Sequence, residues 1–467
     1  MNCRRAAFLL VVAALLVGAP GSAVAGNHDP QHHPQPTPRL VPVGTYDTGL
    51  GANGAEIVSV RDKDGIAALT NVRVGECGNN AGAVDVLDLS DPAHPARLRR
   101  VCIDPASTAA GTPNSVAVHP YRDYFLVVVG QAGARGAVAA YRLSDGAVLA
   151  SALVGIEPDS IAISPDGHWA VVANEAEGTG KGKDGGEGSL SLIDLSGFKP
   201  ARPSQLEARD ISLPSQAGVP GFSAGRTDDI ARLPIDNTPA TLEPESVAFT
   251  GNSRYAYVTL QENSGVVRLE LRSGELAFFG VGETAHAADV TDDGAYAPTA
   301  TLTAFREPDG IALDPTGRFF VTADEGDSRD DAGSGGPRGG RTVSVFDARS
   351  GAFIADSGSQ LDDMAAMAGF YPDSRSDRGG SEPEVLDLTH WRGRTLVAVG
   401  LERANAVALI DVTDKAVPTV VDVERVGVAP EGIKFLHHRG ALHVVTANEG
   451  DGTVSVLEVG CTIRRHP

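Results

Sequence analysis

One short pattern recurs seven times along this chain of 467 residues, and it limits the possible folds more than any other feature. Each copy combines a polar corner, a short apolar strand, a turn and a second apolar strand. The clearest copy is "EPDGIALDPTGRFFVTADEG" at residues 307–326. The equivalent corner residues of the seven copies are Glu56, Asn114, Asp159, Glu245, Asp309, Glu384 and Glu431.

Two further strands are expected after each copy. The third is β-branched and apolar, as in "GSLSLIDLSG" at 188–197, and a more variable segment such as "TVVDVERV" at 419–426 follows it. Four antiparallel strands repeated seven times are typical of a seven-bladed β-propeller. No segment sustains a helical period, so the sequence predicts an all-β fold.

The ends of the repeat array predict how the ring closes. The chain finishes at the third strand of the seventh copy, and "RLVPVGTYDTG" precedes the first copy as a spare strand. An N-terminal strand joining the last blade would remove the open edge of the ring. We therefore expect residues near 40–48 to pair with 453–459.

The N-terminal segment resembles a secretory signal. Two arginines precede the apolar run "AAFLLVVAALLV", and small residues provide a cleavage site after Ala25. We assign 1–25 to a signal peptide, 26–39 to a His/Pro-rich linker, 40–460 to a single propeller and 461–467 to a C-terminal tail. No later apolar run is long enough to cross a membrane. These features predict a secreted, extracellular protein without a membrane span.

The chain is strongly acidic. Its formal net charge is −21, and the mature chain would carry −23 because the signal contains two arginines and no acids. Such a surface repels nucleic acid and favours cations or basic partners. We expect no nucleic-acid partner, a monomer, and a ligand or protein partner whose identity the sequence does not specify.

Three cysteines remain after the predicted cleavage. Cys77 and Cys102 belong to the same repeat and are expected to form a disulfide, since export permits one. Cys461 is left over, as a thiol or an intermolecular link.

The repeat spacing is uneven, and the excess residues are expected in surface insertions. A blade needs roughly 40–50 residues, so longer steps imply inserted loops. The longest insertions are predicted at 197–242, 281–305, 326–341 and 355–381.

Most copies carry one acid at the start of the first strand and another at the end of the second. The two acids are 16 to 18 residues apart with a turn midway between them, so each pair should lie opposite across its hairpin. Five blades would bring ten acids to one face, around the channel axis. Glu56 lacks an acidic partner, and Asn114 and Gln131 replace the acids of another blade. The ten acids are Asp159, Glu175, Glu245, Glu262, Asp309, Glu325, Glu384, Glu402, Glu431 and Glu449.

Carboxylates that converge in this way need partners, because like charges destabilise one another. One interpretation is structural: backbone N–H groups and nearby arginines satisfy the acids. The other is a bound Ca²⁺ ion, which takes several carboxylate and carbonyl oxygens, with the ten acids as its candidate ligands. No other cofactor is expected. The arginines in or beside the motifs are Arg306, Arg329, Arg375 and Arg403.

Several long motifs resemble those of a known family. "TLQEN" at 259–263, "EGDSRD" at 325–330, and "SRSD" at 374–377 with "EPE" at 382–384 are similar to motifs of the choice-of-anchor I family of exported bacterial propellers. The resemblance extends from about residue 44 to 459. It implies a propeller fold and export, and it implies no agreed catalytic residues. The family is similar to mesenchyme-specific surface glycoproteins and YncE-type propellers, and some members are labelled alkaline phosphatase-like.

These observations favour an exported, non-enzymatic propeller that binds a ligand or partner on its acidic channel face, with Ca²⁺ as a candidate ion. One alternative is a Ca²⁺-dependent phosphoester hydrolase, in which clustered carboxylates hold the metal and arginines hold phosphate. Another is a purely structural component of a cell surface or matrix. A fold alone does not decide among these functions.

Overall fold

A computed structural model describes most of the propeller region and none of the predicted signal peptide, which lies outside the described residues. The described residues are 36–72, 77, 82–104, 111–131, 133–176, 186–201, 205–213, 232–234, 242–326 and 339–462.

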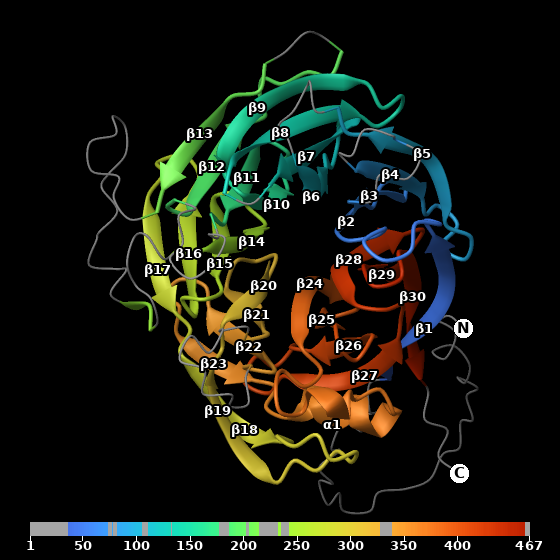
Figure 1. The fold of residues 1–467 in the computed structure, drawn as a ribbon, viewed down its shortest axis with the longest axis vertical. Helices are drawn as coiled ribbons and strands as arrows, with labels where there is room; N and C mark the ends of the chain where they lie inside the picture. The colour runs from blue at the N-terminus through green and yellow to red at the C-terminus, as the bar shows by residue number, and fades with distance from the viewer. Residues whose placement is uncertain are drawn as a thin grey trace, which may run out of the picture.

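Seven four-stranded antiparallel sheets surround a central channel, which confirms the predicted seven-bladed propeller (Figure 1). The first strand of each blade lines the channel, and these strands are β2 (Val58–Arg61), β6 (Thr112–Val118), β10 (Pro158–Ile163), β14 (Pro244–Phe249), β20 (Pro308–Leu313), β24 (Pro383–Trp391) and β28 (Pro430–His438). The second strands are β3 (Ile66–Asn71), β7 (Tyr124–Gly130), β11 (Trp169–Asn174), β15 (Tyr255–Leu260), β21 (Phe319–Asp324), β25 (Arg394–Leu401) and β29 (Ala441–Asn448).

The outer half of each blade is built in the same order. The third strands are β4 (Ala83–Asp88), β8 (Arg135–Arg142), β12 (Ser189–Asp194), β16 (Gly265–Glu270), β22 (Thr342–Asp347), β26 (Ala406–Asp411) and β30 (Thr453–Thr462). The outermost strands are β5 (Ala96–Cys102), β9 (Val148–Ile156), β13 (Ala208–Ser212), β17 (Leu276–Gly280), β23 (Phe353–Asp356), β27 (Thr419–Arg425) and, in the seventh blade, β1 (Thr37–Asp47).

The N-terminal strand closes the ring as predicted. β1 pairs antiparallel with β30 from Thr37 opposite Thr462 to Asp47 opposite Thr453. The strand begins three residues before the expected boundary at residue 40. Leu40 is buried against the seventh blade, while the neighbouring Val41 is about half exposed. The seventh blade therefore contains strands from both ends of the chain, so its formation joins the first blade to the last.

The hydrophobic core lies between neighbouring blades. Each interface packs apolar side chains from the second and third strands of one blade against the next blade; for example, Val397, Ala408 and Val343 belong to one cluster. Gly310 and Gly432 lie where neighbouring blades approach closely, since a Cβ on either would sit within 2.7 Å of a backbone oxygen of the next blade. Such close approach is available only to glycine.

Two insertions form structure outside the ring of blades. A two-stranded sheet of β18 (Glu283–Ala288) and β19 (Ala300–Phe305) lies beside a helix, α1 (Gln360–Ala368) (Figure 1). A short 3₁₀ helix, Asp373–Arg375, follows α1. The insertions predicted at 197–242 and 326–341 fall mostly outside the described residues. Within the part of the chain that the structure describes, no helix has the length and apolarity to cross a membrane.

The first blade carries the predicted disulfide. Cys77 and Cys102 are bonded, with their Cα atoms 5.4 Å apart. Cys461 lies in β30 and is half-buried.

Candidate functional site: the acidic mouth of the channel

The entrance acids project from β-bulges at the start of the channel-lining strands. In β10 the register shifts between Pro158 and Ser160, so Asp159 is the extra residue. In β28 the register shifts between Pro430 and Gly432, so Glu431 is the extra residue there. Equivalent shifts span the acids of β14, β20 and β24. A bulge redirects a side chain, and here it turns each acid toward the channel.

In four blades, the residue before the corner proline has an unusual backbone conformation. Glu157, Glu307, Glu382 and Ala429 have φ values of 52°, 43°, 53° and 54°. A residue other than glycine rarely takes this left-handed conformation, and the position before proline normally prefers an extended one. Strained corners of this kind are concentrated at functional sites.

The same corners hold the exit acids in place. The backbone N–H of Glu175 donates to the carbonyl of Glu157 at 3.0 Å, and the N–H of Glu449 donates to the carbonyl of Ala429 at 2.8 Å. Each exit acid is thus fixed beside the entrance acid of its own blade. The two ends of the hairpin meet at one face, as the spacing of 16 to 18 residues predicts.

The structure brings all ten predicted acids to this end of the channel, which we call the acidic mouth. Eight of them line a single cavity of about 1190 Å³ that continues down the channel. The other two acids adjoin those eight. A carboxylate oxygen of Glu262 lies within 4.8 Å of carboxylate oxygens of Glu175 and Glu245. Glu449 forms a hydrogen bond with Glu431. Whether these acids bind a metal stays a prediction.

Burial and mutual repulsion raise the pKa values of the acids at the mouth. Burial raises the pKa of Asp159 to about 6, and burial with the repulsion of neighbouring acids raises that of Asp309 to about 8. The pKa of Glu431 rises to about 9, first from burial and then from its hydrogen bond with Glu449. Burial and neighbouring carboxylates also hold the pKa of Glu384 well above its usual range.

Two acids at the mouth belong to the site although the sequence did not place them among its candidates. Burial, with the charges of Glu449 and Asp159, raises the pKa of Glu56 to about 8. Glu382 is 5% exposed and lies in a group of three with Glu325 and Glu402. The recurring "EP" corner is the signal that could have identified Glu382.

Two arginines contact acids on one side of the mouth. Arg375 and Arg403 both bind Glu382, the second through its Nε at 2.7 Å, and Arg403 also binds Glu402. Arg306 was expected to pair with the acids of the mouth, and this prediction is wrong. Its guanidinium lies 2.9 Å from the carboxylate of Asp356, in the outermost strand of its blade. Arg329 lies outside the described residues.

The comparisons with known proteins agree with this fold. The sequence profile of the choice-of-anchor I domain matches residues 56–335 and 337–415. The comparison with curated proteins finds no match.

Two solved structures resemble the whole ring. The β-propeller domain of Cps50 (Swd1) from Myceliophteria thermophila is 11% identical with a TM-score of 0.52, covering 90% of this chain and 100% of its own. Kuenenia stuttgartiensis hydrazine synthase is 12% identical with a TM-score of 0.56, covering 88% of this chain and 97% of its own. At these identities the likeness concerns the fold alone.

Proposed function

The chain belongs to the choice-of-anchor I domain family, and from that premise we propose an exported, non-enzymatic propeller that binds Ca²⁺ at its acidic mouth and a ligand or partner there. A choice-of-anchor domain suggests an exported or cell-surface protein. The disulfide between Cys77 and Cys102 fits an extracellular location.

The grouping of the acids is the observation that carries this proposal. Four sets of three acids each offer oxygens within 4.8 Å of one another. Ca²⁺ takes roughly 6–8 oxygen ligands at about 2.3–2.6 Å, and carboxylates are its preferred charged ligands. The four sets are Glu175/Glu245/Glu262, Asp309/Glu325/Glu384, Glu325/Glu382/Glu402 and Glu384/Glu402/Glu431.

Two buried oxygens support a cation rather than a purely internal network. Among the residues that the structure describes, Oε2 of Glu56 and Oε2 of Glu384 are buried without a hydrogen-bond partner. A buried acceptor without a partner is costly, and a bound ion would remove that cost. A cation beside Glu384 would also offset the repulsion from Glu325 and Glu431 that raises its pKa.

The test is metal analysis of the purified protein together with thermal unfolding in Ca²⁺ and in chelator. Ca²⁺ that binds only the folded state raises the free energy of unfolding by about 2.7 kcal/mol at 100 times its dissociation constant. We expect a higher melting temperature in Ca²⁺ than in chelator, and a weaker effect of Mg²⁺, which prefers six ligands in a rigid octahedron. A melting temperature indifferent to Ca²⁺, with no metal in the protein, would exclude the cation.

The hydrolase alternative uses the same acids, with the cation polarising a phosphoester. The chain also contains one G-x-S-x-G pentapeptide, "GFSAG" at 221–225, outside the described residues. That motif acts as a nucleophile elbow between a strand and a helix of an α/β sheet, a context that an all-β ring does not provide. Ca²⁺-dependent phosphatase activity that survives Ser223→Ala would support hydrolysis at the mouth.

The structural alternative assigns the acids to locking the ring. It predicts no response to Ca²⁺, and it predicts that neutral substitutions at the mouth change stability only through lost internal contacts. The melting experiment above therefore separates it from the proposed function.

A further inference from the structure

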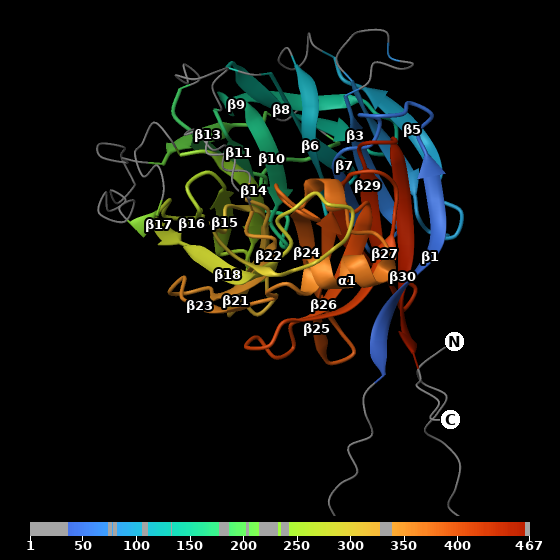
Figure 2. The same cartoon turned by 60° about the horizontal axis from the view of Figure 1, so that its bottom comes forward.

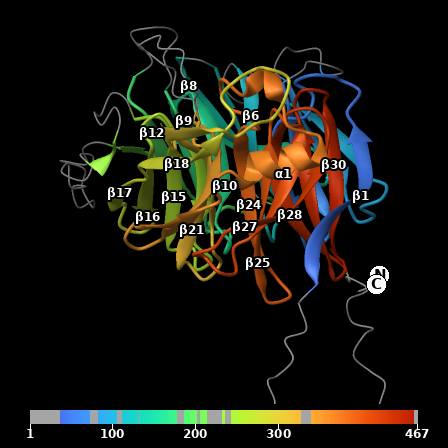
Figure 3. The same ribbon diagram turned by 90° about the horizontal axis from the view of Figure 1, so that it is seen from below.

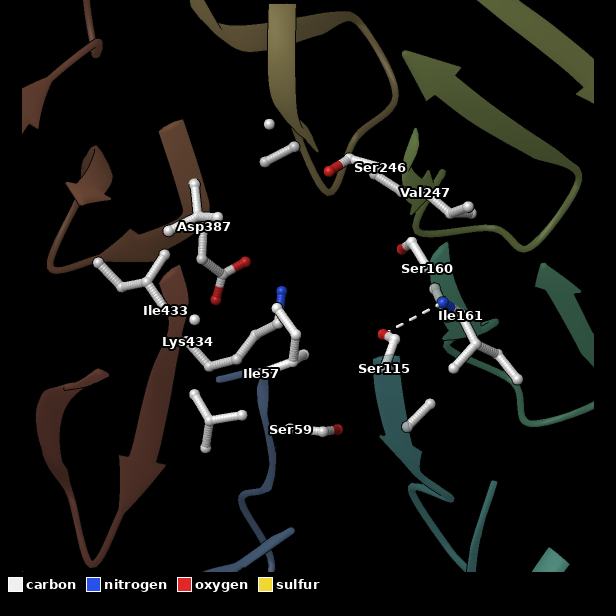
Figure 4. A pocket seen from close by; sticks show the side chains of 18 of the residues that line it. Ile57, Ser59, Ser115, Ser160, Ile161, Ser246, Val247, Asp387, Ile433 and Lys434 are labelled. Carbon is white, nitrogen blue, oxygen red and sulfur yellow. Dashed lines mark hydrogen bonds between the residues drawn. The ribbon is translucent and has the colours of Figure 1, made fainter. Parts of the chain in front are cut away.

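Beneath the acidic mouth, the polar side chains that line the channel are mainly serines and one lysine rather than carboxylates. Ser115, Ser160 and Ser246 come one residue after the corner acid or amide of three successive blades, and they lie along one side of the channel, opposite Lys434 (Figure 4). The first and seventh blades contribute Ser59 and Lys434. Each lies two residues further along its strand than the position equivalent to Ser115. The mouth offers mainly acceptors, whereas this part of the channel offers hydroxyl and ammonium groups.

Hydrogen bonding leaves the hydroxyl protons of Ser59 and Ser115 available to a ligand, whereas the hydroxyl of Ser246 donates to Oδ1 of Asp309 at 3.5 Å. The N–H of Ile161 donates to Oγ of Ser115 at 3.3 Å, and the N–H of Val118 donates to Oγ of Ser59 at 3.0 Å. Each oxygen already accepts a bond from the next blade, and a hydroxyl carries one donor of its own. That donor can point into the channel. Ser160 forms no side-chain hydrogen bond among the described residues.

Lys434 adds a positive charge at the same depth. Its half-buried side chain extends toward the channel axis, and it forms no ion pair within the described part of the chain (Figure 4). The nearby acid is Asp387, whose Oδ2 accepts the N–H of Phe435 at 2.8 Å. Three ammonium donors therefore lie among hydroxyl groups. The carboxylate of Asp387 lies beside them, and Asp62, which also lines the cavity, interacts electrostatically with Asp387.

We propose that this part of the channel binds one small oxyanion, a phosphate or a carboxylate, through Nζ of Lys434 and the hydroxyls of Ser115 and Ser160. The inference goes beyond the proposed function because the anion and the Ca²⁺ occupy different layers of the channel. The two sites are coupled by charge: the acids of the mouth and Asp387 oppose the anion, and cations at the mouth relieve that opposition. Such coupling is reciprocal, so each ligand raises the affinity of the other.

The experiment is a calorimetric titration of the intact protein with inorganic phosphate, and with acetate in a second arm, both in chelator. Lys434→Met removes a charge-assisted contact and is expected to weaken binding roughly 10- to 100-fold. Asp387→Asn removes the opposing charge and is expected to tighten binding several-fold. Lys415→Met is the matched control, because Lys415 is a half-buried lysine that lies over Phe319 rather than in the channel. It should leave the affinity unchanged.

Ser160→Ala serves as a second variant if Lys434→Met does not fold, since no hydrogen bond of the described chain depends on that hydroxyl. It should weaken binding by several-fold. Tighter binding of phosphate than acetate identifies the phosphate class, and the reverse identifies the carboxylate class. Absence of binding by the wild-type protein, or equal binding by the wild type and Lys434→Met, would overturn the anion site. Repeating the titration with Ca²⁺ tests the mouth separately, because anion binding in chelator stands whether or not Ca²⁺ binds.

Discussion

The backbone N–H of Glu402 donates to the carbonyl oxygen of Glu382 at 2.9 Å, which joins the end of one strand to the left-handed corner that begins the hairpin. The bond fixes two carboxylates side by side, 5% exposed in each residue. The bond holds the two main chains together, so the two carboxylates stay in each other's vicinity. The repulsion between them must therefore be offset by a proton, an arginine or a cation.

Replacing Glu402 by Gln tests the cation. The variant keeps the size of the side chain and removes one charge from two of the four acid groups. We expect the rise in melting temperature caused by Ca²⁺ to shrink markedly, measured by scanning calorimetry with Ca²⁺ and with chelator. Glu458→Gln, on an exposed position of β30, is the control and should respond as the wild type does. An unchanged Ca²⁺ response in Glu402→Gln would remove this residue from the site.

The pH dependence of stability should carry the signature of the raised pKa values. Between the ordinary carboxyl pKa and values of about 6 for Asp159, 8 for Asp309 and 9 for Glu431, the folded protein holds protons that the unfolded chain has released. The free energy of unfolding of metal-free protein should then fall as pH rises from about 5 to about 9. Because Ca²⁺ competes with these protons, its stabilising effect should grow over the same range. Denaturant titrations along this range measure both trends, and a flat profile would contradict the raised pKa values.

Glu382 should be more important for stability than for binding. Glu382→Gln leaves Arg375 and Arg403 without their shared carboxylate. Losing one partner of a buried pair costs about 3–5 kcal/mol, and the two guanidinium side chains here are 28% and 44% exposed. We therefore expect a loss of about 1–3 kcal/mol in chemical denaturation. Glu275→Gln, at an exposed position, should change stability little; a Glu382→Gln variant as stable as the wild type would contradict the assignment.

Ring closure can be tested with two neighbouring residues of β1. Leu40 is 3% exposed and Val41 is 49% exposed. Leu40→Ala should lower the free energy of unfolding by about 2–4 kcal/mol, because it leaves a cavity in the seventh blade. Val41→Ala should change it by no more than about 0.5 kcal/mol. Equal effects of the two substitutions would mean that β1 contributes little to closing the ring.

The repeat itself explains why so much of the fold and the mouth could be predicted. A hairpin of fixed length returns the chain to its starting face, so the spacing from Asp159 to Glu175 predicts their proximity without knowledge of other blades. Counting seven copies with one spare strand then predicts closure, and β1 pairs with β30 accordingly.

What the sequence did not reveal depends on contacts between distant segments. The sequence placed Arg375 among the arginines expected to satisfy the acids, but its partner, Glu382, depends on how the insertion after β23 folds, which no periodic pattern records. Helix α1 has only nine residues, too few to be stable by itself, so packing against its neighbours determines it. Arg306 adjoins the motif in sequence, yet its guanidinium pairs with Asp356 of the outermost strand, β23.

The pairing of β1 with β30 also orients the molecule. Asp47 and Thr453 lie at the end of the blade that carries Asn448 and the acidic mouth, whereas Thr37 and Thr462 lie at the other end. The two strands leave the ring together as an arm (Figures 2 and 3). A tether joined beyond Thr37 or Thr462 would therefore hold the propeller by the face opposite the acidic mouth. The acid-lined opening would face outward, toward whatever approaches from the surroundings.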